Sequence, residues 1–163
     1  MRVRKRDGSL EPVDVNRIVA AVSRCCAGLE RVDPMRVALG AISGLCDGAS
    51  SSELDELSIR TAAALVVEEP DYSRLAARLL STVISKEVAN QGIRSFSQSI
   101  EAGRSAGIIG ERTASFVATH SVLLDDAIDP SRDHLFELFG LRTVSDRYLL
   151  RHPETRAPLE TTQ

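Results

Sequence analysis

Tryptophan is absent from this sequence of 163 residues, and aromatic residues together make up only 4% of it. A core therefore has to be built from Ala, Val, Leu and Ile, and with hydrophobic residues at 43% this composition favours packed helices. No apolar run is long enough to span a membrane, and the first residues are charged. These absences predict a mainly α-helical, soluble protein of the cytoplasm with no membrane partner.

A large excess of charge of one sign is also missing. The chain carries 20 Lys and Arg against 23 Asp and Glu, a formal net charge of -3. Such a chain has no overall basic field that would draw it onto nucleic acid, so we expect no nucleic-acid partner. Any anion site must be local, and the N-terminus is one candidate, with Arg2, Arg4, Lys5 and Arg6 within five positions.

Cysteine motifs and the common motifs of nucleotide binding and catalysis are missing too. Cys25, Cys26 and Cys46 form no CxxC pair, which argues against a zinc knuckle and a disulfide framework. The sequence has no GxxxxGK[ST] loop and no GxGxxG. Its three histidines show no spacing typical of a metal site or a catalytic triad. We therefore predict neither catalytic nor metal-ligating residues in this stretch.

What the sequence does contain begins with a predicted β-hairpin, because an Asp-Gly turn signal separates two short extended segments. A two-residue turn would place Val3 opposite Pro12. A three-residue loop that starts at the aspartate would instead place Val3 opposite Val13 and Lys5 opposite Glu11. We favour the second register, because it pairs apolar with apolar residues and a cation with an anion.

Four helices are predicted after the hairpin, and the first shows apolar residues at the helical spacing i, i+3, i+4 and i+7. Their start signals are Asp14, Asp33-Pro34, the capping box of Ser50 with Glu53, and Pro70-Asp71. Helices of similar length with short connections predict a four-helix bundle, which the hairpin would cap.

The helical pattern breaks at positions 90–92, where we place a domain boundary. The first domain is then 1–91 and the second 92–163. The second is predicted to hold small helical segments at 96–102 and 112–124 and to end in a β-hairpin that begins near residue 147.

Two inward charges need an explanation. If Val3 and Val13 face the bundle, strand alternation sends Lys5 and Glu11 to the same inner face, where a charge costs free energy unless it has a partner. An ordinary cross-strand salt bridge at the domain edge is one explanation, and a ligand site is the other.

Further cations point to the same end of the predicted bundle. Lys86 continues the buried stripe of the fourth helix, although a long side chain that snorkels past the last apolar turn would also explain it. Arg17 lies in the first turn of the first helix, which the helix dipole disfavours unless an anion is nearby. Together with Lys5 and Arg6, these residues can converge as a triphosphate requires.

The order of these motifs resembles the ATP-cone, a nucleotide-sensing regulatory domain built as a four-helix bundle capped by a small sheet. The resemblance covers about the first 90 residues. It is carried by Val3-x-Lys5-Arg6-Asp7-Gly8, Glu11-x-Val13, Ile18, Asp47-Gly48, Ser51 to Asp55, Pro70-Asp71-Tyr72, Leu75-Ala76-Ala77-Arg78 and Lys86.

The following residues are similar to the lead-in of the large subunit of class I ribonucleotide reductase, which makes deoxyribonucleotides for DNA replication. This likeness is carried by Asp129-x-x-Arg132-Asp133, residues 139–143, residues 146–150 and residues 160–163. In that family the radical-bearing and redox cysteines would all lie after Gln163. The chain is therefore expected to be part of an oxidoreductase but inactive by itself.

The resemblance implies that ATP, which activates, or dATP, which inhibits, binds as an allosteric effector with Mg²⁺. By position, phosphates would be held by Lys5, Arg6, Arg17 and Lys86. The base pocket would be lined by Val3, Val13 and Ile18, while base, ribose or magnesium would be contacted by Glu11, Asn16, Ser51 and Asp55. Arg17 stands where a lysine is more usual, which keeps the charge and changes the geometry.

The implied partners are the remainder of the large subunit and a radical-generating small subunit, in a homo-oligomer. The alternative is a free-standing ATP-cone module that regulates a partner in trans. A helical interaction domain that binds no nucleotide is the third hypothesis.

Overall fold

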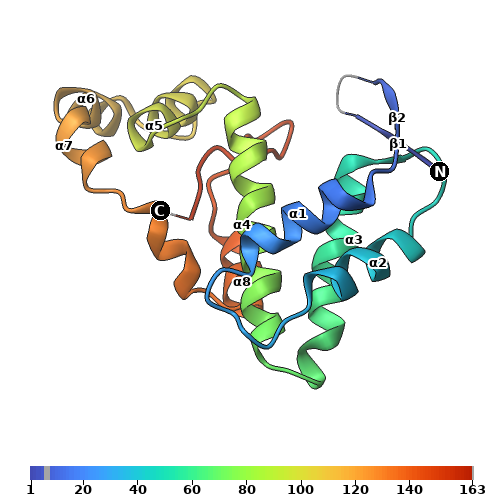
Figure 1. The fold of residues 1–163 in the computed structure, drawn as a ribbon. Coiled ribbons are helices and arrows are strands. Elements are labelled where there is room, and N and C mark those ends of the chain that lie inside the picture. Colours follow the sequence, from blue (N-terminus) through green and yellow to red (C-terminus); the bar gives the residue numbers. More distant parts are fainter. Residues whose placement is uncertain (6–7, 163) are drawn as a thin grey trace. The chain divides into compact units, whose positions relative to one another are not determined.

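The computed structural model describes residues 1–5 and 8–162, and their fold is mainly helical with a small three-stranded sheet (Figure 1). The sheet consists of β1 (Arg2–Arg4), β2 (Leu10–Pro12) and β3 (Ala49–Ser50). The α-helices are α1 (Val15–Cys25), α2 (Pro34–Ser43), α3 (Ser51–Ala64), α4 (Asp71–Asn90), α5 (Phe96–Ser105), α6 (Glu111–Thr119), α7 (Ser121–Asp126) and α8 (Leu138–Arg147). Two short 3-10 helices, η1 (Leu65–Val67) and η2 (Pro130–Leu135), complete the described elements. None of these helices is long and apolar enough to cross a membrane.

The first three helices begin where the sequence predicts. Asp14 and Asp33 cap α1 and α2 by accepting hydrogen bonds from backbone N–H groups of the first turn, and Pro34 opens α2. Ser50 and Glu53 form the predicted capping box of α3, each accepting from the other's backbone N–H. These predictions succeed because caps are contacts between residues two or three positions apart.

The register of the hairpin differs from the favoured prediction. Val3 lies opposite Glu11, not opposite Val13, and Arg4 lies opposite Leu10. The loop is closed between Lys5 and Ser9, where the backbone N–H of Lys5 donates to the Ser9 carbonyl over 2.8 Å. The favoured register would instead have placed Lys5 opposite Glu11.

Gly8 accounts for this register. Its φ of +87° lies in the left-handed region that glycine tolerates, and three-residue hairpin loops favour such a residue as their last. The observed register is two positions away from the predicted one. Because side chains alternate with a period of two, a shift of two leaves each residue on its predicted face.

A third strand completes the sheet and was not predicted. β3 pairs with β1 in parallel, with Val3 opposite Ala49 and Arg4 opposite Ser50, so the strand order is β2-β1-β3. Ser50 is also the N-cap of α3. The pairing therefore fixes the start of α3 beside the end of β1.

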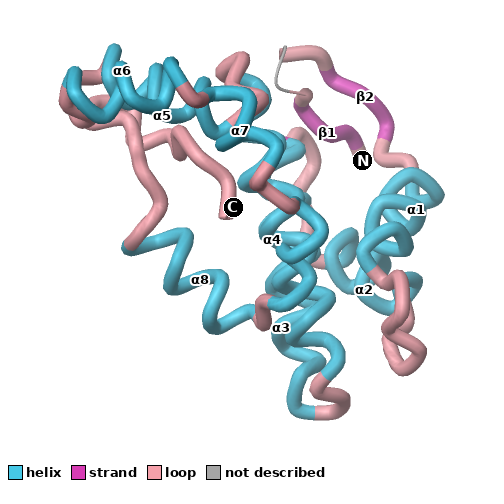
Figure 2. The backbone as a smooth tube through the Cα atoms, turned by 90° about the vertical axis from the view of Figure 1, so that its left-hand side faces the viewer, coloured by secondary structure: helices cyan, strands magenta, loops and turns pink. Residues whose placement is uncertain are grey.

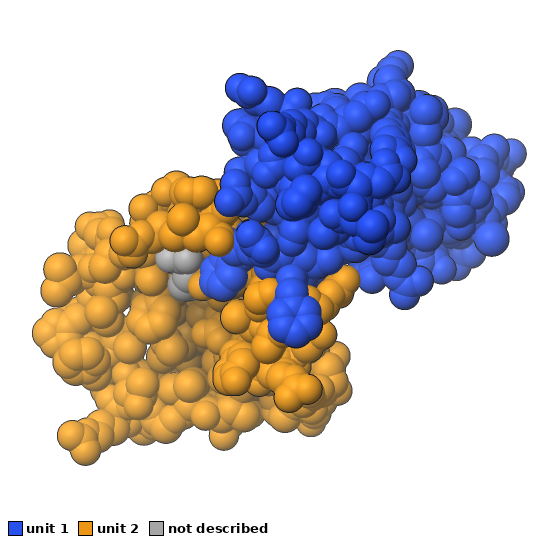
Figure 3. All heavy atoms as spheres, turned by 90° about the horizontal axis from the view of Figure 1, so that it is seen from below, with its two compact units in different colours: residues 1–80, 136–139 blue, residues 81–135, 140–163 orange. Residues whose placement is uncertain are grey.

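Contacts divide the chain into two compact units, drawn in different colours in Figure 3. The first unit consists of residues 1–80 and 136–139, and the second of residues 81–135 and 140–163. The division falls inside α4, whereas the boundary predicted from sequence at residue 91 follows the end of that helix. The predicted boundary stays a prediction.

In the first unit, α2 packs against both α1 and α3. Val22, Val37, Ile59 and Leu75 are among the fully buried side chains of this core. The approach of α2 to α3 needs Gly40, because a Cβ there would lie 2.6 Å from Cγ2 of Thr61. These contacts confirm a helical first unit with a small sheet, and a closed four-helix bundle stays a prediction.

In the second unit, α5, α6 and α7 pack on one another around Ile100, Ala114 and Val117. The single helix predicted over 112–124 is in fact two, broken at His120. The break is accompanied by a contact that the sequence does not show. Asp125 of α7 accepts hydrogen bonds from the backbone N–H and hydroxyl of Ser97 at the start of α5, over 2.8 and 2.7 Å.

The predicted C-terminal hairpin is reduced to a hairpin-like loop. Residues 138–147 form α8, which the sequence reasoning did not predict, and the following chain doubles back with one isolated bridge between Arg151 and Pro158. The backbone N–H of Leu159 donates to the Leu150 carbonyl over 2.7 Å. On the other side of the bridge, the backbone N–H of His152 donates to the Ala157 carbonyl over 2.9 Å. The N–H groups of Leu150 and Ala157 donate to the side chains of Glu160 and Thr155 instead of continuing the ladder.

Candidate functional site

The inner face of the β1–β2 hairpin carries two charged residues. Val3 is 7% exposed, and Lys5, Glu11 and Val13 on the same face are half-buried. The residues of the outer face are all exposed, namely Arg2, Arg4, Leu10 and Pro12. The alternation of exposure confirms that Lys5 and Glu11 point inward, as predicted from the strand pattern.

The Glu11 carboxylate brings two cations together. Its Oε2 atom lies 3.1 Å from Nζ of Lys5 and 3.5 Å from Nη1 of Arg17. Lys5 reaches it diagonally across the strands, since Lys5 lies beside Ser9 and Glu11 is opposite Val3. We name Lys5, Glu11 and Arg17 the hairpin charge cluster.

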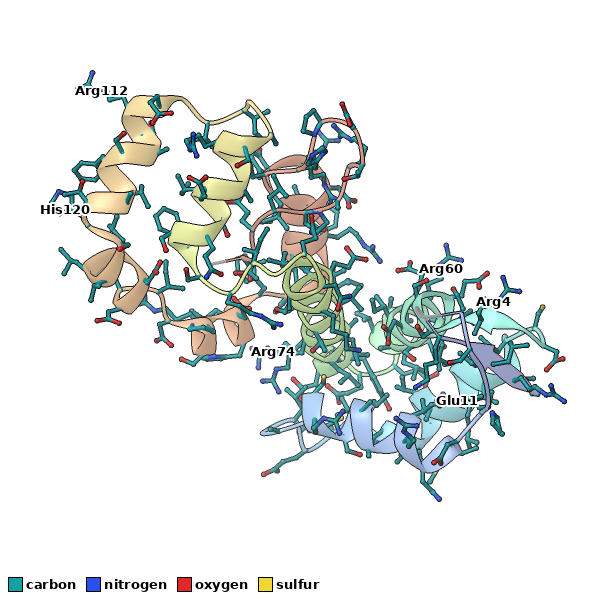
Figure 4. All side chains as sticks on the ribbon, turned by 90° about the horizontal axis from the view of Figure 1, so that it is seen from above. Arg4, Glu11, Arg60, Arg74, Arg112 and His120 are labelled. Atoms are coloured by element: carbon teal, nitrogen blue, oxygen red, sulfur yellow. The ribbon has the colours of Figure 1, made fainter. Side chains whose placement is uncertain are left out.

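The cluster resolves the unfavourable placement of Arg17. This residue lies in the first turn of α1, where the helix dipole repels a cation, and the Glu11 carboxylate supplies the nearby anion. Figure 4 labels Glu11 on the strand that leads into α1, and Figure 2 shows the same succession of β2 and α1 along the backbone. The three charges thus come from three consecutive elements, with Lys5 at the end of β1, Glu11 on β2 and Arg17 on α1.

The start of α1 places the other predicted residues of this segment. Asp14 accepts from the backbone N–H groups of Asn16 and Arg17 over 2.9 and 3.2 Å, and the Asn16 side chain is exposed. Ile18 is 9% exposed. Of the three residues predicted to line a base pocket, Val3 and Ile18 are therefore buried in the core and Val13 is the more accessible.

The start of α3 lies at the end of β1. Ser51 and Asp55 are half-buried on its first and second turns. The backbone N–H of Ser50, the Ser50 hydroxyl and the charge of Arg4 each lower the pKa of Glu53 from its ordinary value. Glu53 therefore stays ionised, and its carboxylate accepts a hydrogen bond from the backbone N–H of the N-cap residue Ser50.

Two of the predicted phosphate ligands, Arg6 and Lys86, are not among the residues that the structure brings together in the hairpin charge cluster. Arg6 lies outside the described residues. Lys86 is an exposed residue of the part of α4 that belongs to the second unit. The predicted role of each in the site rests on the sequence alone.

Sequence reasoning missed the residues that anchor the first strand. The carboxylate of Asp47 accepts from the backbone N–H of Arg2 over 2.6 Å, and the Gly48 N–H donates to the Arg2 carbonyl over 2.8 Å. The only local signal was the Asp-Gly turn, in which Gly48 has a φ of +81°. Nothing in that signal indicates that its partner is the N-terminus.

The three cysteines are free thiols. Burial is the main cause that raises the pKa of Cys26 to about 11, and the neighbouring Cys25 adds to the effect. The Cys26 thiol donates to the Val22 carbonyl over 3.3 Å. A thiol that stays protonated at neutral pH is a poor nucleophile, which gives Cys26 the character of a structural residue.

The hairpin charge cluster has the chemistry of an anion site. Lysine and arginine donors pair well with phosphate oxygens, and the starts of α1 and α3 add helix N-termini to the hairpin. Within residues 1–5 and 8–162, no group of three or more His, Cys, Asp or Glu side chains could hold a metal ion. A magnesium ion would fit here only if phosphate oxygens and water supplied most of its ligands.

Comparison with known families identifies the first half of the chain, because residues 1–87 match the model of the ATP cone domain. This chain belongs to the ATP-cone family. The matched residues contain the hairpin, β3, the hairpin charge cluster and most of α4. The resemblance seen in the sequence motifs is therefore confirmed.

The relatives of the ATP-cone chain are large reductase subunits. This chain is 35% identical over 158 residues to the ribonucleoside-diphosphate reductase large chain of Neurospora crassa. The aligned residues cover 93% of this chain and 17% of that protein. The same identity holds for the large subunit of Plasmodium falciparum, where 19% of the relative is covered, and for the large chain of Schizosaccharomyces pombe, where 20% is covered. The chain thus spans about a fifth of the length of these relatives.

Proposed function

We propose that this chain is an allosteric sensor of adenine nucleotides, with ATP or dATP bound at the hairpin charge cluster. The observation that carries the proposal is the convergence of Lys5 and Arg17 on one oxygen of Glu11 at the start of α1. Two cations held 3.1 and 3.5 Å from a carboxylate oxygen can also hold phosphate oxygens, which accept the same charge-assisted hydrogen bonds.

The remaining residues are assigned around this cluster. Arg6 and Lys86 are proposed as further phosphate ligands on the strength of the sequence motifs. Val3, Val13 and Ile18 are proposed to line the pocket of the nucleotide base. Asn16, Ser51 and Asp55, with Glu11, are proposed to contact the base, the ribose or the magnesium ion. Mg²⁺ would enter with the phosphates, since the described residues offer no ligand set of their own.

We propose further that this chain is the N-terminal regulatory portion of a ribonucleoside-diphosphate reductase large subunit. The support is the extended similarity to reductase large subunits, which reaches beyond the ATP-cone to cover 93% of the chain. In this proposal the nucleotide controls the overall rate of deoxyribonucleotide synthesis. The remainder of the large subunit, in a homo-oligomer, and a radical-generating small subunit are the proposed partners, in the cytoplasm.

Calorimetric titration of the 163-residue chain tests the sensing function. ATP-Mg and dATP-Mg are expected to bind, and AMP is expected to bind at least about tenfold more weakly, because paired cations gain most from the β and γ phosphates. GTP-Mg at the same concentrations is the control for general triphosphate attraction. Equal affinities for ATP and AMP, or no heat with any adenine nucleotide, would refute the proposed site.

Asp55→Asn tests how the site distinguishes ATP from dATP. A buried polar group that one ligand leaves unpaired costs about 1–3 kcal/mol, so a group that reads the 2′-hydroxyl can separate the two ligands. In the full-length subunit we expect the variant to bind ATP normally and to lose most of its inhibition by dATP, because a ligand shifts an equilibrium only through differential affinity.

The measurement is reductase activity against dATP concentration for wild type and variant. Glu56→Gln is a matched control, since Glu56 is the next residue of α3 and pairs with Arg60 on the surface, 3.3 Å away. Superimposable inhibition curves for wild type and Asp55→Asn would show that Asp55 does not distinguish the ribose of ATP from the deoxyribose of dATP.

A further inference from the structure

The hairpin charge cluster contains its own anion, the Glu11 carboxylate, with which an anionic ligand has to compete. Lys5 and Arg17 both approach Oε2 of Glu11, so one carboxylate oxygen serves two cations. A phosphate that uses the same cations has to replace this carboxylate as their partner. We propose that Glu11 is a resident counterion that competes with nucleotide phosphates and thereby sets the concentration at which the site fills.

The exposure of the cluster supports exchange rather than permanent pairing. The side chains of Lys5, Glu11 and Arg17 retain 36%, 46% and 68% of their solvent exposure. Partly exposed ion pairs are weak and can be exchanged, in contrast to buried pairs, which leave an uncompensated charge when one partner is removed. Phosphate can therefore displace Glu11 without leaving a buried charge unpaired.

The hairpin keeps Glu11 at the cluster by backbone geometry. Its strand position is fixed by pairing with Val3, and Lys5 reaches it on the diagonal of the same face. The carboxylate cannot leave the neighbourhood when phosphate binds, so its negative charge continues to repel the phosphates, even where it contacts another part of the nucleotide. A sensor has to release its nucleotide when the concentration falls, and this repulsion weakens binding.

This inference rests on the proposed function, and its probe is inorganic tripolyphosphate, which lacks base and sugar. Glu11→Gln keeps the size and shape of the side chain and removes the charge. In calorimetry on the 163-residue chain at low salt, we expect this variant to bind tripolyphosphate about threefold to fivefold more tightly than wild type, the upper part of the range of exposed ion pairs. The gain is expected to shrink as salt is raised, because exposed charges are screened.

Two controls separate the charge of Glu11 from other effects. Glu11→Asp keeps the carboxylate and is expected to stay within about twofold of wild type. Glu30→Gln changes the net charge equally at an exposed position beyond the other end of α1, about 16 Å along an 11-residue helix, and is expected to leave the affinity unchanged. Thermal unfolding of each variant checks that the fold is intact.

The outcomes distinguish this inference from the sensing function. If wild type binds ATP and Glu11→Gln binds tripolyphosphate equally or more weakly, Glu11 is not a competing counterion, and the sensing function stands. The inference is also overturned if ATP binds but tripolyphosphate binds neither protein. If wild type binds no adenine nucleotide, the proposed function itself fails.

Discussion

Replacement of Arg78 by alanine is expected to lower the free energy of unfolding by about 2–4 kcal/mol, since two hydrogen bonds from a charged donor are lost. Nη1 of Arg78, on α4, donates to the carbonyls of Cys25 and Ala27 over 3.0 and 2.6 Å. These carbonyls lie at the C-terminal end of α1, where a cation also interacts favourably with the helix dipole. Without the guanidinium, this end of α1 loses both of these hydrogen bonds to α4.

Urea unfolding followed by circular dichroism measures the effect. Arg74→Ala is the matched control one turn earlier on α4, where the exposed arginine lies 3.8 Å from Asp71, and it should cost less than about 1 kcal/mol. The loss in free energy of unfolding for Arg78→Lys should lie between those of Arg78→Ala and Arg74→Ala, because an ammonium lacks the planar fork of a guanidinium. An unfolding midpoint for Arg78→Ala equal to that of Arg74→Ala would show that the Arg78 hydrogen bonds contribute nothing to stability.

Lys5→Ala is expected to weaken the binding of ATP by about 10- to 100-fold, the effect of losing a charge-assisted hydrogen bond to phosphate. The reason is the inward direction of the side chain, which holds the ammonium 3.1 Å from the carboxylate that phosphate would replace. Calorimetric titration with ATP-Mg measures the change.

Arg4→Ala is the decisive control, because Arg4 is adjacent in sequence, carries the same charge and faces outward on β1. It should weaken ATP binding by no more than about threefold, through long-range attraction alone. Similar losses for Lys5→Ala and Arg4→Ala would mean that the N-terminal cations act as a general basic surface, not as a site built on one face of the hairpin.

Several features of the fold were predictable because their causes are local. The caps at Asp14, Asp33 and Ser50 depend on hydrogen bonds over two or three positions, and all three formed. The inward direction of Lys5 and Glu11 was also predictable, although the favoured register was wrong, since a shift by two positions preserves the face.

Other features depend on contacts between distant residues and left no local pattern. The parallel pairing of Val3 with Ala49 joins segments 46 positions apart, through a strand of only two residues. The break at His120 accompanies a hydrogen bond from Ser97 to Asp125, 28 positions away. Periodicity within a single segment cannot reveal such partners.

The sequence by itself determined the helical composition, the starts of the first three helices, the set of residues on the inner hairpin face and, through its motifs, the ATP-cone family. The tertiary structure decided that Lys5 and Arg17 share one oxygen of Glu11 and that α3 begins beside β1. Capping and alternation follow from the geometry of neighbouring residues, whereas the meeting of side chains from two elements depends on the register and packing that bring those elements together.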